Sequence, residues 1–111
     1  MDAKYQWIKI AENIHEIVFE KNNIAQINIG EKSICLIRTS IGLKACASKC
    51  PHAGGDLSIA YLDSKENIIC PVHNYHFNLN NGRDTIGDGY FLKIYKVIAN
   101  ESGIFVGLEK W

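Results

Sequence analysis

Two short clusters of cysteine and histidine constrain this chain more than any other feature of its sequence. The first is Cys50-Pro51-His52 and the second is Cys70-Pro71-Val72-His73, with seventeen residues between them. Each cluster offers one thiolate and one imidazole. A structural zinc site usually pairs cysteines at Cys-x₂₋₄-Cys and histidines at His-x₃₋₅-His spacing instead. The mixed pairs therefore favour a two-iron cluster with unequal irons, one bound by Cys50 and Cys70 and the other by His52 and His73.

Composition and charge narrow the classes of partner. The chain has 111 residues, and its twelve basic residues balance twelve acidic ones. No cluster of Lys and Arg offers the basic face that phosphate binding requires, so we expect no nucleic-acid partner. The N-terminus lacks a cationic start followed by an apolar run, and no apolar stretch is long enough for a bilayer. We expect a cytoplasmic protein without a membrane partner, whose four cysteines serve a metal rather than a disulfide framework.

Most of the chain is typical of short strands separated by turns. Alternation over Ala25 to Ile29 predicts a half-buried strand that ends at Gly30, and Ile34 to Ile37 predicts a strand covered on both faces. Further strands are expected over the ranges 43–47, 67–69, 75–79, 90–98 and 103–108, with turns at 39–42, 80–82 and 100–103. This spacing favours an antiparallel all-β domain.

The segment from Trp7 to Val18 is ambiguous. Its apolar residues recur at helical intervals, so periodicity alone predicts a helix. Residues 7–10 also suit an edge strand, followed by a turn at Glu12-Asn13. We favour the strand followed by irregular chain.

The two clusters and their surroundings resemble the Rieske ferredoxins, whose signature is Cys-x-His, a spacer of about this length and Cys-x-x-His. The resemblance is strongest over residues 43–82. It includes several positions outside the ligand set, namely Gly54, Leu57, Pro71, Phe77, Leu79 and Gly82. The resemblance implies one [2Fe–2S] cluster and an all-β, Rieske-like fold of stacked small antiparallel sheets. A single domain 1–111 would then have a base of about 1–45 and 80–111 and a cluster-binding insertion of about 46–79.

Departures from the family pattern carry further predictions. Asn74 replaces a common glycine, and Asn best tolerates the left-handed backbone expected there. Ala60 replaces another frequent glycine, a change without an interpretation. High-potential members carry a disulfide where this chain has Gly55 and Val72. They also carry serine and tyrosine donors to sulfur where this chain has Tyr75 and Phe77. Fewer donors to the cluster imply a low reduction potential.

The resemblance also implies a function. The chain would be a soluble single-electron carrier rather than an enzyme, passing electrons from a flavin-dependent reductase to a terminal oxygenase. Its partners would dock over His52 and His73. The alternatives are a small Rieske subunit of a larger oxidoreductase, such as a nitrite-reductase-type complex, and a non-redox module that binds zinc.

Other cysteines and histidines have simpler interpretations. His15 is expected to be an ordinary surface or hydrogen-bonded residue. His76 should turn away from the site, because three residues along a strand reverse the face. A two-residue turn at Ser40-Ile41 would set Cys35 opposite Cys46 as neighbouring thiols without a disulfide. Residues 84–89 are expected to form a surface loop that flanks the cluster.

Overall fold

The computed structural model describes residues 3–110. They form nine strands and two short 3-10 helices, which confirms the all-β prediction. Within this part of the chain no helix is long and apolar enough to cross a membrane. The elements are β1 (Tyr5–Ala11), η1 (Ile14–Glu16), β2 (Ile24–Ile29), β3 (Lys32–Thr39), β4 (Gly42–Ala47), η2 (Leu57–Ile59), β5 (Tyr61–Leu62), β6 (Ile68–Ile69), β7 (His76–Phe77), β8 (Ile94–Asn100) and β9 (Gly103–Glu109).

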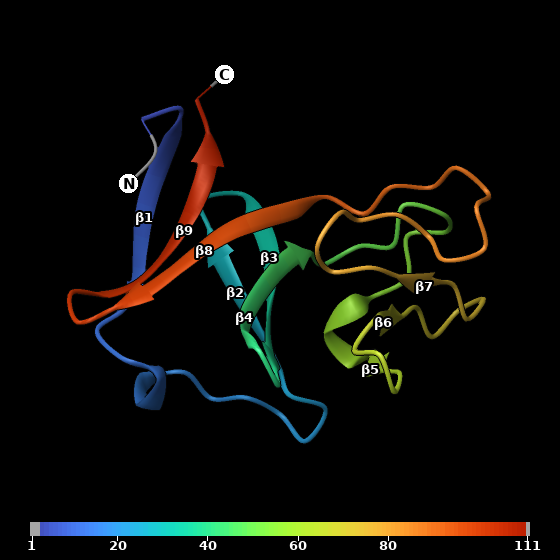
Figure 1. Cartoon of the computed structure of the whole chain (residues 1–111), viewed down its shortest axis with the longest axis horizontal. Coiled ribbons are helices and arrows are strands. Elements are labelled where there is room, and N and C mark those ends of the chain that lie inside the picture. The colour runs from blue at the N-terminus through green and yellow to red at the C-terminus, as the bar shows by residue number, and fades with distance from the viewer. Residues whose placement is uncertain (1–2, 111) are drawn as a thin grey trace.

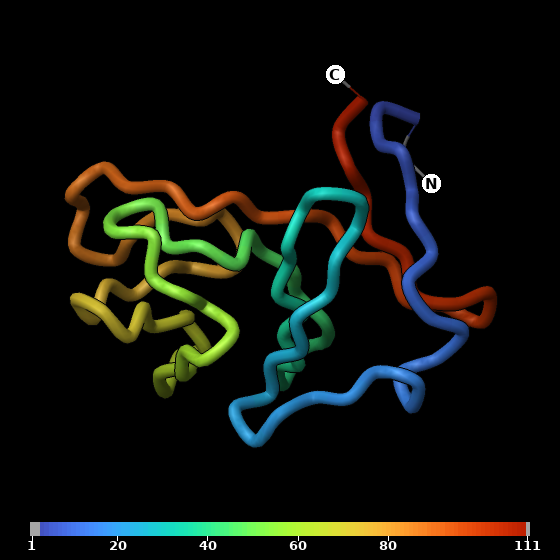
Figure 2. Tube along the Cα trace, turned by 180° about the vertical axis from the view of Figure 1, so that it is seen from behind, coloured from blue at the N-terminus to red at the C-terminus, as the bar shows by residue number. Residues whose placement is uncertain are grey.

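The strands make two antiparallel sheets. The large sheet has the order β1-β9-β8-β4-β3-β2, and the small sheet has the order β5-β6-β7. Figure 1 shows the small sheet and its loops at one end of the long axis, away from the start of β1 and the end of β9. The same separation is seen from behind in Figure 2. The loops that carry the cysteine and histidine clusters therefore lie far from both ends of the described chain.

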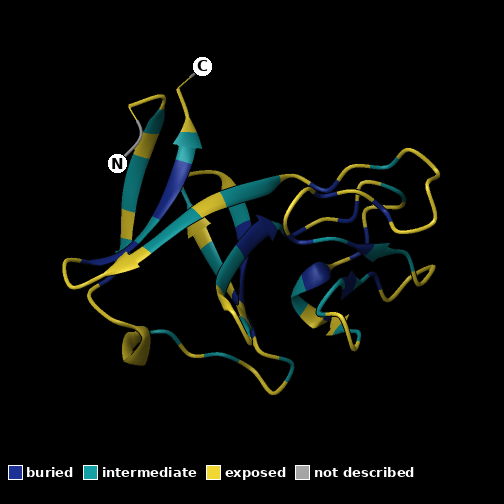
Figure 3. Ribbon diagram, viewed as in Figure 1, coloured by how far each residue is buried: buried dark blue, intermediate teal, exposed yellow. Residues whose placement is uncertain are grey.

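Strand β3 supplies side chains to two cores. Ile34 and Leu36 pack with Ala45 and Val106 inside the curl of the large sheet, whereas Ile37 belongs to the core shared with the small sheet. All four residues from Ile34 to Ile37 are fully buried. Figure 3 colours the whole chain by burial and shows buried segments both in the large sheet and around the small one. Successive side chains of a strand point to opposite faces, so a continuous apolar run suits a strand covered on both sides. The prediction from this run is confirmed.

The hairpin between β3 and β4 has the predicted register. Arg38 pairs with Leu43, and Cys35 pairs with Cys46, across a two-residue turn at Ser40-Ile41. Both cysteines are buried free thiols. Their mutual hydrogen bond and their burial raise the pKa of Cys46 well above its usual value. The prediction that these thiols are neighbours is confirmed.

The N-terminal segment is a strand, as favoured over the helix. β1 pairs with β9 along its length, and a short 3-10 turn follows at Ile14–Glu16. The side chain of Asn13 caps this turn by accepting a hydrogen bond from the His15 N–H at 2.9 Å. Three residues are too few for a helical apolar face. Pairing with β9 therefore overrides the helical spacing of Trp7 to Val18.

Two strand predictions need correction. The strand expected over 90–98 begins only at Ile94, because the preceding residues form an irregular loop with an isolated bridge between Arg83 and Phe91. The strand expected over 75–79 is reduced to His76–Phe77. Strand β5 and helix η2 were not predicted. Two- and three-residue elements produce no periodicity that a sequence pattern could reveal.

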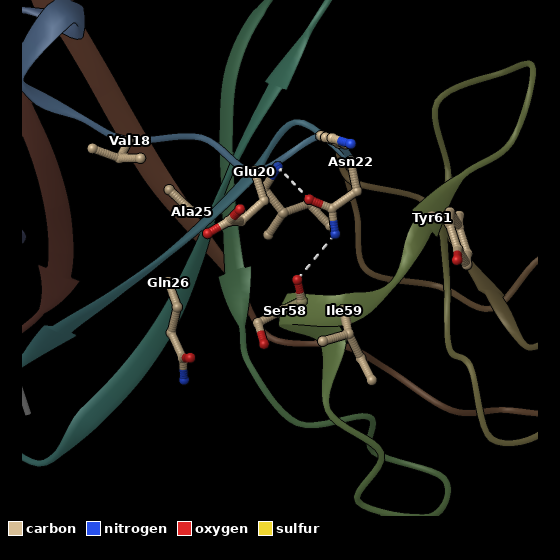
Figure 4. Close-up of a pocket in the computed structure, with 10 residues that line it drawn as sticks. Val18, Glu20, Asn22, Ala25, Gln26, Ser58, Ile59 and Tyr61 are labelled. Atoms are coloured by element: carbon tan, nitrogen blue, oxygen red, sulfur yellow. Dashed lines mark hydrogen bonds between the residues drawn. The ribbon is translucent and has the colours of Figure 1, made fainter.

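Side-chain hydrogen bonds join the two sheets. The amide of Asn22, just before β2, donates to the carbonyls of Ser58 and Ala60 at 3.0 and 2.9 Å. Figure 4 shows the bond to Ser58 beside a hollow of about 900 Å³ between β2 and η2. The carboxylate of Glu66 accepts from the Ser40 N–H at 2.8 Å. These contacts hold the small sheet against the large one.

Candidate metal centre

Two loops with matching backbone geometry carry the Cys/His clusters. In the first, the Cys50 N–H donates to the Gly55 carbonyl and the Gly54 N–H donates to the Cys50 carbonyl, both at 2.8 Å. In the second, Cys70 N–H donates to Tyr75 and Asn74 N–H donates to Cys70, both at 2.9 Å. Each cysteine therefore begins the same tight turn, and the following histidine is carried by that turn.

The fifth residue of each loop adopts a left-handed backbone. Gly54 has φ of 69° and Asn74 has φ of 59°. Glycine adopts this conformation freely, and asparagine is the side-chain residue that tolerates it best. The prediction that Asn74 preserves the turn is confirmed.

The two loops bring the thiols of Cys50 and Cys70 together at their buried end. The two residues are 3% and 1% exposed, and their side chains share a hydrogen bond. Burial raises the pKa of the Cys50 thiol, and the Cys70 contact adds to this rise, while backbone N–H groups of Ala53 and His52 oppose it. A bound metal would reverse this preference, because metals bind the thiolate.

The two imidazoles converge at the outer end of the same loops. The Nδ1 atoms of His52 and His73 lie 3.1 Å apart, with ring centroids separated by 4.8 Å. His52 is half-buried and His73 is exposed. The four residues picked out by the sequence therefore form two pairs carried by the same two loops: two buried thiols, and two imidazoles that are more exposed.

Position 55 has no room for a side chain between the two loops. A Cβ built at this position would lie 2.7 Å from Val72 Cγ2 and 2.8 Å from Cys70 Sγ. The first loop therefore approaches the second cysteine closely enough to exclude any side chain. Together the two loops carry two sulfur and two nitrogen donors, which is the donor set of a cofactor that takes two ligands of each kind. Within residues 3–110 no three His, Cys, Asp or Glu side chains converge on a single metal position, and a two-iron cluster needs only two protein ligands on each iron.

The remaining cysteines and histidines lie elsewhere. His76 faces Asp63, with 2.7 Å between Nδ1 and the carboxylate, and His15 is exposed on η1. The prediction that His76 turns away from the site is confirmed. The hollow in Figure 4 is lined by residues of β2, η2 and the chain before β2, and it includes none of the four candidate ligands. The candidate site is therefore separate from this hollow.

A third loop, residues 84–90, borders the site. Figure 1 shows it beside the first ligand loop, and Figure 2 shows the same proximity from behind. Its first residue, Asp84, is 6% exposed. Burial works to raise the pKa of this carboxyl, but backbone N–H donors of Asp88, Tyr90, Gly87 and Ile86 lower it overall. The dipeptide Asp88-Gly89 predicts a turn from the sequence, whereas no feature of the sequence predicts that Asp84 is buried.

A profile of the family described as "Rieske [2Fe-2S] domain" matches residues 6–86 of the chain. The matched segment covers most of the sequence and contains both ligand loops. The fold and the two loops define a class of protein, namely small antiparallel β domains with paired Cys/His loops. The chain belongs to the Rieske [2Fe–2S] domain family, and its cofactor is one [2Fe–2S] cluster.

Solved structures share the fold at low sequence identity. The ferredoxin of carbazole 1,9a-dioxygenase from Nocardioides aromaticivorans IC177 matches with a TM-score of 0.75 and 15% identity, covering 95% of this chain and 99% of its own. A structure described as an NADH-dependent nitrite reductase small subunit from Mycobacterium tuberculosis matches with a TM-score of 0.78 and 16% identity, covering 96% and 98%. A chain in the complex of reduced oxygenase and oxidized ferredoxin in carbazole 1,9a-dioxygenase matches with a TM-score of 0.74 and 24% identity, covering 95% of each. No curated protein sequence matches the chain.

Proposed function

We propose that this chain is a soluble single-electron carrier, a Rieske ferredoxin that is not itself a catalyst. Cys50 and Cys70 hold one iron of the cluster, and His52 and His73 hold the other. The carrier takes electrons from a flavin-dependent reductase and delivers them to a terminal oxygenase. Both partners dock over the two imidazoles.

The pairing of the two thiols and of the two imidazoles supports this proposal most directly. Two equivalent loops place the thiols in contact in the interior, and they place two Nδ1 atoms 3.1 Å apart at the outer end of the loops. The bound cluster supplies reversible uptake and release of one electron. The chain encloses the sulfur side, which keeps water away from it, and leaves the histidine side accessible to a partner.

The loops suit electron transfer because they are held from several sides. Backbone hydrogen bonds close each turn, and the strands β6 and β7 lead into and away from the second loop. A functional site on such a scaffold changes little in geometry when its charge changes. Little rearrangement is what a fast one-electron carrier needs.

The surroundings support a low reduction potential. Each hydrogen bond to cluster sulfur stabilises the reduced form, which carries the additional negative charge. The hydroxyl of Tyr75 donates to the Asp88 carboxylate at 2.8 Å, and Phe77 has no hydroxyl. We therefore expect a midpoint near the lower end of the Rieske range, which runs from about −150 to +300 mV.

A second candidate function has comparable structural support. The chain covers the nitrite reductase small subunit from Mycobacterium tuberculosis almost completely, as it does the dioxygenase ferredoxins. As a subunit of a larger oxidoreductase, the chain would use the same cluster within a stable complex. Purification separates the two functions: a carrier is isolated alone as a monomer that dithionite reduces, whereas a subunit is isolated with its enzyme.

The primary test is spectroscopic. Anaerobically purified protein should be brown, should contain two irons and two sulfides per chain, and should bleach when dithionite is added. The reduced centre should show nitrogen coupling from two histidines in its paramagnetic resonance spectrum. Colourless protein with stoichiometric zinc would contradict the proposal and favour a structural metal site.

The variant His73→Cys tests the ligand assignment. A thiolate in place of a neutral imidazole adds negative charge to the ligand set, so a retained cluster should have a lower potential. His15→Cys is the matched control, since His15 is exposed on η1. A redox titration of both variants would exclude His73 as a ligand if its replacement left the midpoint unchanged.

A further inference from the structure

The two candidate imidazole ligands have different surroundings. The ring of His52 lies against Tyr75, with 4.4 Å between centroids, and meets the ring of Tyr90 nearly edge-on at 4.8 Å. His73 has a ring contact with His52, and its side chain is otherwise exposed. One histidine is therefore enclosed and the other is open.

Tyr90 reaches His52 because Asp84 folds the third loop. The two Asp84 carboxylate oxygens accept hydrogen bonds from the N–H groups of Asp88 and Tyr90, each at 2.9 Å. Asp84 itself is fixed to the small sheet by a bridge to Phe77. A nearly buried carboxylate that satisfies several backbone donors makes the loop a defined structure. The position of the Tyr90 ring is thus set by Asp84.

Tyr75 is held at both ends. Its ring stacks on the fully buried Phe77, with a centroid distance of 6.3 Å, and its hydroxyl donates to Asp88 at 2.8 Å. The rings of Tyr75 and Tyr90 also contact each other, at 5.4 Å and nearly perpendicular. Two tyrosines from two loops therefore form a continuous wall around His52, anchored to the core at one side and to the third loop at the other.

We infer that Tyr75 and Tyr90 are positioning residues that enclose His52, so that electrons enter and leave the protein through the ring of His73. This inference rests on the proposed function. The Nδ1 atoms of both rings face inward, so each Nε2 lies on the outer edge. Only His73 presents that edge without an aromatic cover. The neighbouring Val72, 51% exposed, places an apolar side chain beside His73.

Site-resolved modification of the intact, cluster-loaded protein tests the inference. Diethylpyrocarbonate acylates accessible imidazole nitrogen, and peptide mass spectrometry separates His52 from His73. Each aromatic contact that must open slows access by a factor of about 2 to 12, so two contacts predict modification of His73 about fivefold or more ahead of His52. Iron content and visible absorption of the same sample are read first.

A matched pair of variants isolates the wall. Tyr90→Leu removes one ring and should accelerate modification of His52 by about 2- to 12-fold, leaving His73 unchanged. Tyr90→Phe keeps the ring and should behave as the parent protein. Tyr75→Phe keeps its ring but loses the tie to Asp88, and should fall between the two. If Tyr90→Leu loses its cluster, Tyr75→Phe still tests whether the tyrosines cover His52.

The outcomes are distinct. Equal modification of the two histidines in brown, iron-loaded protein would overturn the inference and leave the carrier function standing. The same conclusion follows if Tyr90→Leu and Tyr75→Phe both leave the His52 rate unchanged. Colourless protein would contradict the proposed function itself, and the inference with it.

Discussion

Asp63 is a residue whose charge matters to the small sheet. It faces His76 at 2.7 Å and accepts hydrogen bonds from the backbone N–H groups of Lys65 and Asn67. Burial works against the charged form, but the His76 and backbone hydrogen bonds outweigh it and lower the pKa of Asp63 from 3.8 to about 2. A carboxyl whose pKa is depressed by folding stabilises the protein above its unfolded pKa, and that stabilisation is lost as the pH falls toward the folded value.

The pH window for Asp63 therefore lies between about 4 and about 2. We expect the rate at which acid bleaches the cluster to rise through this window. Asp63→Asn should bleach faster at pH 5 and depend less steeply on pH below it. Stopped-flow visible absorption measures both, with Glu101→Gln in the exposed β8–β9 turn as control. Identical pH profiles for Asp63→Asn and the parent protein would show that this carboxylate does not support the site.

Gly55 offers a second residue-scale prediction. An alanine there would place its Cβ within 2.8 Å of both Val72 and Cys70, and overpacking of this kind costs about 1–3 kcal/mol. Gly55→Ala should therefore lose its visible absorption at a lower temperature and retain less iron. Gly54→Ala is the matched control: its strain is that of a left-handed backbone, and its Cβ would meet nothing within 4 Å. If Gly55→Ala retained at least as much iron and heat resistance as Gly54→Ala, close loop packing would not be what position 55 requires.

At the scale of elements, the joint between the two sheets depends on Asn22. Its amide satisfies the carbonyls of Ser58 and Ala60 in and after η2, and its oxygen accepts from the Ile24 N–H at 3.2 Å. Replacement by alanine would leave these groups without their partner, at a cost of about 1–3 kcal/mol. Urea titration should show this loss for Asn22→Ala, and a much smaller change for Asn28→Ala, whose side chain is exposed on β2. If Asn22→Ala and Asn28→Ala lost similar amounts of unfolding free energy, the contact between the two sheets would not depend on Asn22.

Elements with a strong pattern were predictable from the sequence. The run Ile34 to Ile37 and the turn at Ser40-Ile41 fixed β3, β4 and their register, because both-sided burial and a two-residue turn leave little freedom. The ligand loops were also found, since Cys-x-His and Cys-x-x-His are local and rare. Asn74 confirms that even the backbone conformation of a loop residue can be inferred when the turn is recognised.

The unpredicted parts are those that tertiary contacts decide. β5 and η2 are too short for periodicity, and Trp7 to Val18 had helical spacing although β9 pairs with its first half. Asp84 looked like any loop acid, yet it is buried by backbone donors four and six residues further on. Tyr90 was assigned to a strand, whereas it belongs to the loop that closes over His52. These features depend on how the loops meet, which single-residue preferences do not encode.

At the scale of the whole molecule, the balanced charge leaves local groups to set the field at the cluster. Asp84 and Asp88 place two carboxylates in the loop beside the ligand loops, and Asp88 is linked to Tyr75, whose pKa its hydrogen bond raises to about 12. A negative charge near the cluster disfavours the reduced form, which is itself more negative. We therefore expect the third loop to lower the potential in addition to enclosing His52.

Asp88→Asn separates these two effects. The asparagine oxygen can still accept the Tyr75 hydroxyl, so the wall around His52 should persist while the charge is lost. Because Asp88 is exposed and screened by salt, we expect the midpoint to rise by only on the order of 10 mV at low ionic strength, and by less at high ionic strength. Redox titrations at two salt concentrations measure this difference, and Glu12→Gln, in the exposed chain between β1 and η1, controls for net charge. A salt-independent rise, or a fall, would mean that Asp88 acts through the geometry of Tyr75 rather than through its charge.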